Sequence, residues 1–145
     1  MSELSDRLLV YLAALVEDGF PPPVSEYHFA APLRDWRFDA AYPDLRVAFE
    51  VEGGQYINGR HVRPGGFDKD AQKYNAAALL GWQVYRFPTK WIEDGRAFRW
   101  ANFVLRYNLG VTTGTYRHEV ADLLAIPRPR RPARQRSRKA LARPS

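Results

Sequence analysis

Two acidic residues in one short segment have types and spacing suited to holding a cation. Glu50 and Glu52 are two positions apart in the run Val-Ala-Phe-Glu-Val-Glu at 47–52. Alternate side chains of a strand share a face, so both carboxylates lie on one side and Val47 and Phe49 on the other. Such a pair also occurs on the solvated face of an edge strand, so a cation site is indicated only if a further ligand lies nearby.

Asp39 supplies that ligand if the chain folds back at the Pro-Asp pair of residues 43–44, which is typical turn chemistry. The hairpin brings Asp39 opposite or diagonal to Glu50, at the roughly 5–8 Å of cross-strand neighbours. Converging carboxylates repel one another unless a cation lies among them, and Mg²⁺ or Mn²⁺ takes oxygen ligands. The sequence therefore predicts a divalent-cation site on this hairpin, with glycines at 53–54 allowing close backbone approach.

The surrounding pattern predicts the elements that position these acids. Apolar periodicity, caps and breakers indicate helices over about 3–18, 67–80, 95–107 and 115–125, and strands over about 25–30, 35–41, 45–52 and 82–87. Residues 53–66 are glycine-rich and predict a loop. This order favours an α/β fold, with a mixed central sheet flanked by helices on both faces.

The bulk composition limits the class of protein. A chain of 145 residues fits one domain, and the absence of cysteine excludes disulfides, thiol catalysis and cysteine-bound zinc. No apolar run approaches the roughly 20 residues needed to cross a bilayer, and the first residues do not resemble a signal peptide. We expect a cytoplasmic protein without a membrane partner. No nucleotide cofactor is expected either, because no G-x-G-x-x-G motif is present.

All of the excess positive charge lies at the C-terminus. Residues 127–145 hold eight basic side chains and no acid, whereas residues 1–126 carry a net charge of −2. We expect one folded domain over 1–126 and a disordered Arg/Pro-rich tail over 127–145. Arg128, Arg130 and Arg131 begin a run that suits a polyanion such as DNA, because phosphate contacts release counterions. A tail that only aids solubility, or that docks an acidic protein, is the alternative.

Several motifs of the chain, in their order, resemble the PD-(D/E)XK nuclease superfamily, and in particular small phage or bacterial proteins like the very-short-patch-repair endonucleases. The resemblance covers about residues 25–90 and consists of Arg-Phe-Asp at 37–39, the segment 47–54, Gly-Arg-His at 59–61, the helix from Asp68 to Asn75, and the segment 80–87. It implies a restriction-endonuclease-like fold and a Mg²⁺-dependent DNA endonuclease directed by shape, mismatch or junction. A non-catalytic nucleic-acid-binding module of the same fold is the alternative, and a homodimer stays open.

The resemblance also implies roles for individual residues. Asp39 stands at the family's metal-binding aspartate, Glu50 at its second acidic ligand, and the carbonyl of Val51 would complete the set. Glu52 stands where the usual pattern has lysine. It either acts as general base or helps to hold a second cation, or the missing positive charge comes from the next helix, through Lys69 or Lys73.

Further residues are candidates for weaker reasons. Family members often carry another acid before the core, which makes Glu26 an accessory ligand or, alternatively, a solvent-facing strand residue. Besides the tail, the residues expected to contact phosphates are Arg37, Arg60, His61, Arg63, Lys69 and Lys73. Arg37 would equally cover a sheet edge, and His61 would equally face water. The aromatic residues between 91 and 107 favour core packing over base stacking, and base stacking is kept as the alternative.

Overall fold

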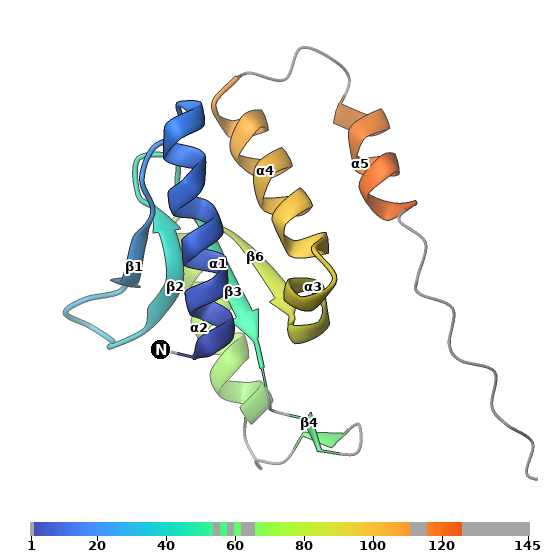
Figure 1. Cartoon of the computed structure of the whole chain (residues 1–145). Helices are drawn as coiled ribbons and strands as arrows, with labels where there is room; N and C mark the ends of the chain where they lie inside the picture. Colours follow the sequence, from blue (N-terminus) through green and yellow to red (C-terminus); the bar gives the residue numbers. More distant parts are fainter. Residues whose placement is uncertain (1, 54–55, 58–59, 62–65, 111–115, 126–145) are drawn as a thin grey trace, which may run out of the picture.

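A four-stranded mixed sheet forms the centre of the described part of the chain (Figure 1). The structure, a computed structural model, describes residues 2–53, 56–57, 60–61, 66–110 and 116–125. The strand order is β1-β2-β3-β6, in which β1–β2 and β2–β3 are antiparallel and β3–β6 is parallel. The strands are β1 (Val24–His28), β2 (Arg37–Tyr42), β3 (Val47–Glu52) and β6 (Gln83–Pro88).

Helices cover both faces of this sheet. In Figure 1 helix α1 crosses in front of the sheet with α4 beside it, and α2 lies behind. A 3₁₀ turn, η1, extends α1, and α5 packs beside α4. The bounds are α1 (Glu3–Ala14), η1 (Leu15–Asp18), α2 (Gly66–Leu79), α3 (Thr89–Glu93), α4 (Arg96–Asn108) and α5 (Tyr116–Leu124). Within the described ranges, no helix has the length and apolarity that a bilayer crossing requires.

The sheet separates two apolar cores. The larger lies between the sheet and the α1/α3/α4 layer, where Leu8 and Leu12 of α1 meet Val47 and Phe49 of β3. The smaller lies on the other face, where Ala48 and residues of β2 pack against Ala77 of α2 and Trp82. Strand β3 therefore buries both of its faces over residues 47–49, as its continuous apolar sequence favours. Its more polar end, Glu50 to Glu52, is left to line a site.

The β2–β3 hairpin turns where the sequence predicts. The N–H of Leu45 donates to the carbonyl of Tyr42 (3.0 Å), and the N–H of Arg46 to that of Pro43 (3.2 Å). Arg46 closes the turn with φ +55°, a left-handed conformation uncommon for arginine. The register pairs Ala40 with Phe49. Continued by one residue, it brings Asp39 beside Glu50, at the end of the ladder.

The expected elements are present with shifted ends, and three short ones were not expected. The first helix tightens into η1 before Gly19, which ends it at φ +92°. Helix α3 was missed because five residues between a strand and a longer helix give no periodicity. The expected loop at 53–66 contains the two-residue strands β4 (Tyr56–Ile57) and β5 (Arg60–His61), which pair antiparallel. The mixed α/β class with a helix-flanked sheet is confirmed.

Candidate active site

A polar cavity of about 190 Å³ lies where the ends of β3 and β6 meet helix α2. Its lining combines four acids with three bases and a tyrosine: Arg37, Asp39, Glu50, Val51, Glu52, Asp70, Lys73, Tyr74 and Arg86. The hairpin contributes the first acids, α2 contributes Asp70, Lys73 and Tyr74 at helical i, i+3 and i+4 spacing, and β6 contributes Arg86. The geometry thus brings Asp39, Glu50 and Glu52 to one place.

Asp39 is held by the backbone of the facing strand. The N–H of Val51 donates to Asp39 Oδ2 at 2.8 Å. Burial raises the pKa of Asp39, and the nearby charge of Glu50 raises it further, against a lowering effect of the Val51 N–H and of Lys73. The carboxylate is therefore oriented but energetically costly when ionised, which is the condition that a nearby cation relieves.

Glu50 is the most buried charged group of the site, and only 7% of its side chain is exposed. Its two oxygens have separate partners on α2, because Oε1 forms an ion pair with Lys73 Nζ and Oε2 accepts from the Tyr74 hydroxyl. Burial and the charge of Glu50 both raise the pKa of Tyr74, so this hydroxyl stays protonated and donates. Helix α2 thus clamps Glu50 from one side.

Arg86 joins the remaining acids. Its Nη2 forms an ion pair with Glu52 Oε1 and lies 3.8 Å from Asp70 Oδ2, while its guanidinium lies 4.1 Å from the centre of the Tyr74 ring. Glu52 Oε1 is buried and has no partner of regular hydrogen-bond geometry, so the ion pair is what compensates its charge. In the parallel register Arg86 lies next to Glu50. Burial lowers the pKa of Arg86, and Glu50 opposes that effect.

The donor set fits a magnesium-like ion with few protein ligands. Within the described ranges, no three His, Asp or Glu side chains form a ready-made metal-binding group. Mg²⁺, however, is usually bound through one or two carboxylates and keeps several waters. Asp39 and Glu50 line one cavity, and the charge of Glu50 contributes to the raised pKa of Asp39. Two such carboxylates are enough for this kind of ion.

The other predicted site residues differ in where the structure places them. Arg37 lines the cavity, and its guanidinium forms an ion pair with Glu26 at 3.0 Å; Glu26 itself is not among the lining residues. Lys69 is exposed on α2 and does not line the cavity, in contrast to Lys73. For Arg60 and His61 only the backbone, as β5, is described. The predicted roles of Arg63 and of Arg128, Arg130 and Arg131 lie outside the described residues.

Three cavity residues were missing from the predicted site: Asp70, Tyr74 and Arg86. A signal for each was present in the sequence. Asp70 and Tyr74 share a helix face with Lys73, and Arg86 is the charged residue in the otherwise uncharged strand segment 82–87. What the sequence did not show is that α2 and β6 direct these residues at the hairpin.

Removing the hydroxyl of Tyr74 tests the clamp on Glu50. We expect Tyr74→Phe to lower the free energy of unfolding by about 1.5 kcal/mol, because a partly buried carboxylate loses a charge-assisted hydrogen bond while the ring over Arg86 remains. Urea unfolding followed by circular dichroism measures this. The matched control is Tyr85→Phe, whose hydroxyl donates to the exposed Gln83 at 3.0 Å and whose loss should cost below about 0.5 kcal/mol. Equal losses of unfolding free energy in the two variants would show that the Tyr74 hydroxyl does not stabilise Glu50.

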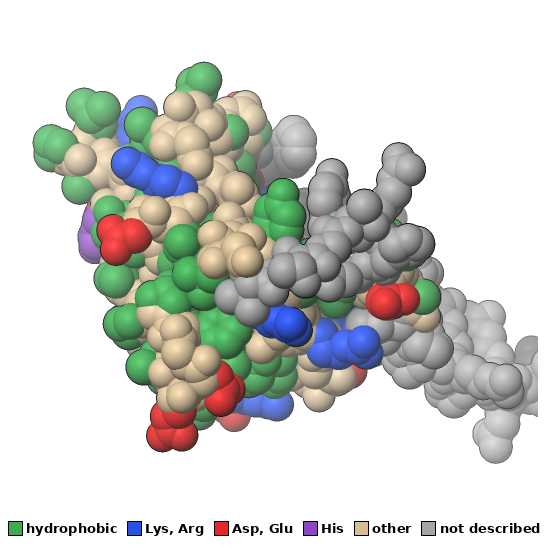
Figure 2. All heavy atoms as spheres, turned by 90° about the horizontal axis from the view of Figure 1, so that it is seen from above, with side chains coloured by type: hydrophobic (Ala, Val, Ile, Leu, Met, Phe, Trp, Pro, Cys, Tyr) green, Lys and Arg blue, Asp and Glu red, His purple; other side chains and the backbone are tan. Residues whose placement is uncertain are grey.

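Charge outside the cavity is not concentrated in the view of Figure 2. Seen from above, the described basic and acidic side chains form small separate groups among hydrophobic and polar surface.

Comparison of the chain with protein-family models, with curated proteins and with solved structures finds no match. The residues of the site itself are therefore the basis for assigning its chemistry.

Proposed function

We propose that the chain is a Mg²⁺- or Mn²⁺-dependent nuclease that hydrolyses phosphodiester bonds of DNA, as the resemblance to PD-(D/E)XK nucleases implies. The observation that carries the proposal is the shared cavity of Asp39 and Glu50, with Asp39 held by the N–H of Val51. A mixed sheet flanked by helices also supports a restriction-endonuclease-like fold. Nicking or cutting within a strand is the proposed mode.

Asp39 and Glu50, with the carbonyl of Val51, are the residues that would hold the ion. A bound divalent ion stabilises charge developing on the phosphate and lowers the pKa of a bound water. The cations of the chain have complementary tasks: Lys73 and Arg86 present positive charge to phosphate oxygens entering the cavity. Glu52 holds Arg86 in place, so the position usually occupied by lysine is linked to a cation on the neighbouring strand.

This assignment favours Lys73 over Lys69 as the source of the missing positive charge. Lys73 contacts Glu50 directly, whereas Lys69 is exposed outside the cavity. It also favours Glu52 as a positioning residue for Arg86. A general base at position 52 would have to leave its ion pair first.

Cation-dependent nicking tests the proposal. We expect the full-length protein to convert supercoiled plasmid to the open circular form with Mg²⁺ or Mn²⁺ and to lose this activity in a chelator. Glu50→Gln should abolish nicking, because the amide cannot supply a negative ligand. Its one carbonyl oxygen can still accept from Lys73, while its NH2 group faces the Tyr74 hydroxyl, which can turn to accept from it. Glu93→Gln, on α3 and outside the cavity, is the control and should nick as the parent does. Nicking that persists in chelator, or in Glu50→Gln, would contradict the proposal.

A specific observation favours a second candidate, a nucleic-acid-binding module without catalysis. Glu50 and Glu52 are already neutralised by Lys73 and Arg86. In that case the ion pairs persist and no cation binds between the carboxylates, while the exposed basic side chains of the cavity contact phosphate. The plasmid experiment separates the two functions, because such a module retards DNA in a gel but leaves it uncut at every cation concentration.

A further inference from the structure

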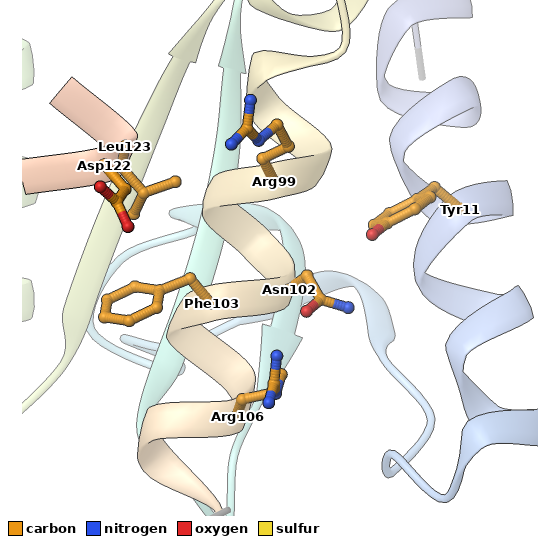
Figure 3. A pocket seen from close by; sticks show the side chains of 7 residues that line it. All are labelled: Tyr11, Arg99, Asn102, Phe103, Arg106, Asp122 and Leu123. Atoms are coloured by element: carbon orange, nitrogen blue, oxygen red, sulfur yellow. The ribbon is translucent and has the colours of Figure 1, made fainter. Parts of the chain in front are cut away.

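A second polar pocket, of about 310 Å³, lies between α1, α4 and α5 (Figure 3). Seven residues line it: Tyr11, Arg99, Asn102, Phe103, Arg106, Asp122 and Leu123. The helices α1 and α4 pack on the face of the sheet opposite α2, and the pocket shares no residue with the candidate active site. The residues that line this pocket therefore serve a purpose separate from the candidate active site.

The two arginines of this pocket are available to a ligand. Arg99 and Arg106 are exposed, and within the described part of the chain neither has an ion-pair partner within 4 Å. They are seven residues apart on α4, which corresponds to about 10 Å along the helix axis. Asn102 and Phe103 lie between them in sequence and line the same pocket. Two cations with an aromatic ring between them suit a strand with repeated negative charges.

Phe103 is distinguished from the other aromatic residues of this region by what surrounds it. Trp91, Phe98 and Trp100 pack against the larger core, which confirms core packing for them. Phe103 is half-buried, does not belong to that cluster, and points toward α5 in Figure 3. Its ring stacks against that of Tyr107, with centroids 6.4 Å apart, so a base would stack on the side of the ring away from Tyr107. Base stacking on an exposed aromatic face stabilises by about 1–3 kcal/mol per base and tolerates any sequence.

The polar groups of the walls fit the edges of a base better than they fit a simple anion. The Asn102 side chain points toward Tyr11 and hydrogen-bonds to it, and the amide keeps hydrogen-bonding capacity beyond that bond. Asp122, on α5, accepts only, so it would repel a phosphate but accept from the exocyclic amino group of a base. The volume is at the lower end of small-ligand pockets, about 300–1,000 Å³. That size suits one unpaired base.

We propose that this pocket binds one unpaired nucleotide of a nucleic-acid strand, with its base on Phe103 and its flanking phosphates on Arg99 and Arg106. This deepens the proposed function and rests on it in one respect, that the substrate is nucleic acid. It adds a preference for substrates with a single-stranded or flipped-out nucleotide. The site acts in binding and takes no part in hydrolysis.

The test uses the full-length protein in chelator, so that no strand is cut, and a single-stranded oligonucleotide containing 2-aminopurine. Stacking on Phe103 should quench the 2-aminopurine fluorescence in the parent. Phe103→Leu should lose this quenching while anisotropy still reports binding, because leucine keeps the apolar volume but offers no ring. Quenching that is the same in both proteins would overturn the proposal, as would its absence from the parent.

The arginines are tested by salt dependence. Removing two phosphate contacts to a single strand should reduce the slope of log K against log salt by about 1.4 in the double variant Arg99→Ala/Arg106→Ala. Both positions are exposed on a helix, where alanine is well tolerated. The control Arg34→Ala removes an exposed charge from outside the pocket and should leave the slope unchanged. An unchanged slope in the double variant would overturn the proposal. Because these measurements need neither cation nor cleavage, their failure is distinguishable from failure of the nuclease assignment.

Discussion

Asp39→Asn should abolish cation-dependent nicking and at the same time stabilise the fold. We expect at least about a 100-fold loss of rate, which corresponds to about 2.7 kcal/mol of transition-state stabilisation. Asparagine can still accept from the N–H of Val51, so the geometry is kept and only the charge is removed. A quantitative plasmid-nicking assay at saturating Mg²⁺ measures the rate.

The stabilising effect follows from the raised pKa of Asp39. A carboxyl whose pKa is higher in the folded than in the unfolded state favours folding when protonated and disfavours it once the pH has passed the folded pKa. At neutral pH the ionised group therefore costs stability, and its removal should raise the Tm. The difference between variant and parent should shrink as the pH falls through the titration of Asp39.

The control for both effects is Asp44→Asn, in the exposed turn of the same hairpin. It should leave the rate unchanged and move the Tm by less than about 2 °C. A lower Tm with Asp39→Asn would mean that the ionised carboxylate is a net stabilising group, and the electrostatic account of the cavity would be wrong. An unchanged rate would remove Asp39 from the mechanism.

Lys73→Met should produce the largest loss of stability among the site variants. Glu50 is 7% and Lys73 20% exposed. Among the described residues, removing the lysine leaves this buried carboxylate with the Tyr74 hydroxyl as its hydrogen-bond donor, and with Arg86 nearby but paired to Glu52. Breaking a buried ion pair from one side costs about 3–5 kcal/mol, and the remaining hydrogen bond places this case near about 3 kcal/mol. That is a large share of the roughly 5–15 kcal/mol that stabilises a typical domain. Denaturant unfolding at pH 7 measures it.

A double variant separates the pair interaction from simple loss of packing. Glu50→Gln/Lys73→Met should recover to within about 1 kcal/mol of the parent, because a neutral partner no longer needs the ammonium group. Lys69→Met is the matched control, since this lysine lies one turn away on the same helix and is exposed; it should change stability by less than about 0.5 kcal/mol. A similar loss of stability in Lys73→Met and in Lys69→Met would show that Lys73 stabilises the protein through helix α2 in general and not through its ion pair with Glu50.

The hairpin half of the site could be predicted because its geometry is local. Strand alternation places Glu50 and Glu52 on one face, and the turn at residues 43–46 is close enough in sequence to set the position of Asp39. No long-range packing has to be known for this. The resulting juxtaposition is a property of about fifteen consecutive residues.

The second half could not be predicted because it depends on packing between distant segments. Lys73, Tyr74 and Arg86 meet the acids only because Ala77 of α2 and Trp82 pack on the β2–β3 face, and because β6 pairs parallel to β3. Helical spacing shows that residues 70, 73 and 74 share a face, but it does not show what that face meets. The family pattern has a lysine where this chain has Glu52, and it does not indicate which other basic residue takes over the positive charge. The sequence alone therefore leaves two possible roles for Glu52.

The ion pairs of Lys73 and Arg86 with Glu50 and Glu52 have a consequence for how the protein is made. Domains that are assembled around a metal remain unfolded until the ion arrives, because their ligands repel one another without it. Here the chain carries its own counterions, so folding in the test tube or on the ribosome should proceed at any magnesium concentration. A divalent ion bound by Asp39 and Glu50 would then displace the Lys73 ammonium group from Glu50, and the released lysine would be free to contact an incoming anion.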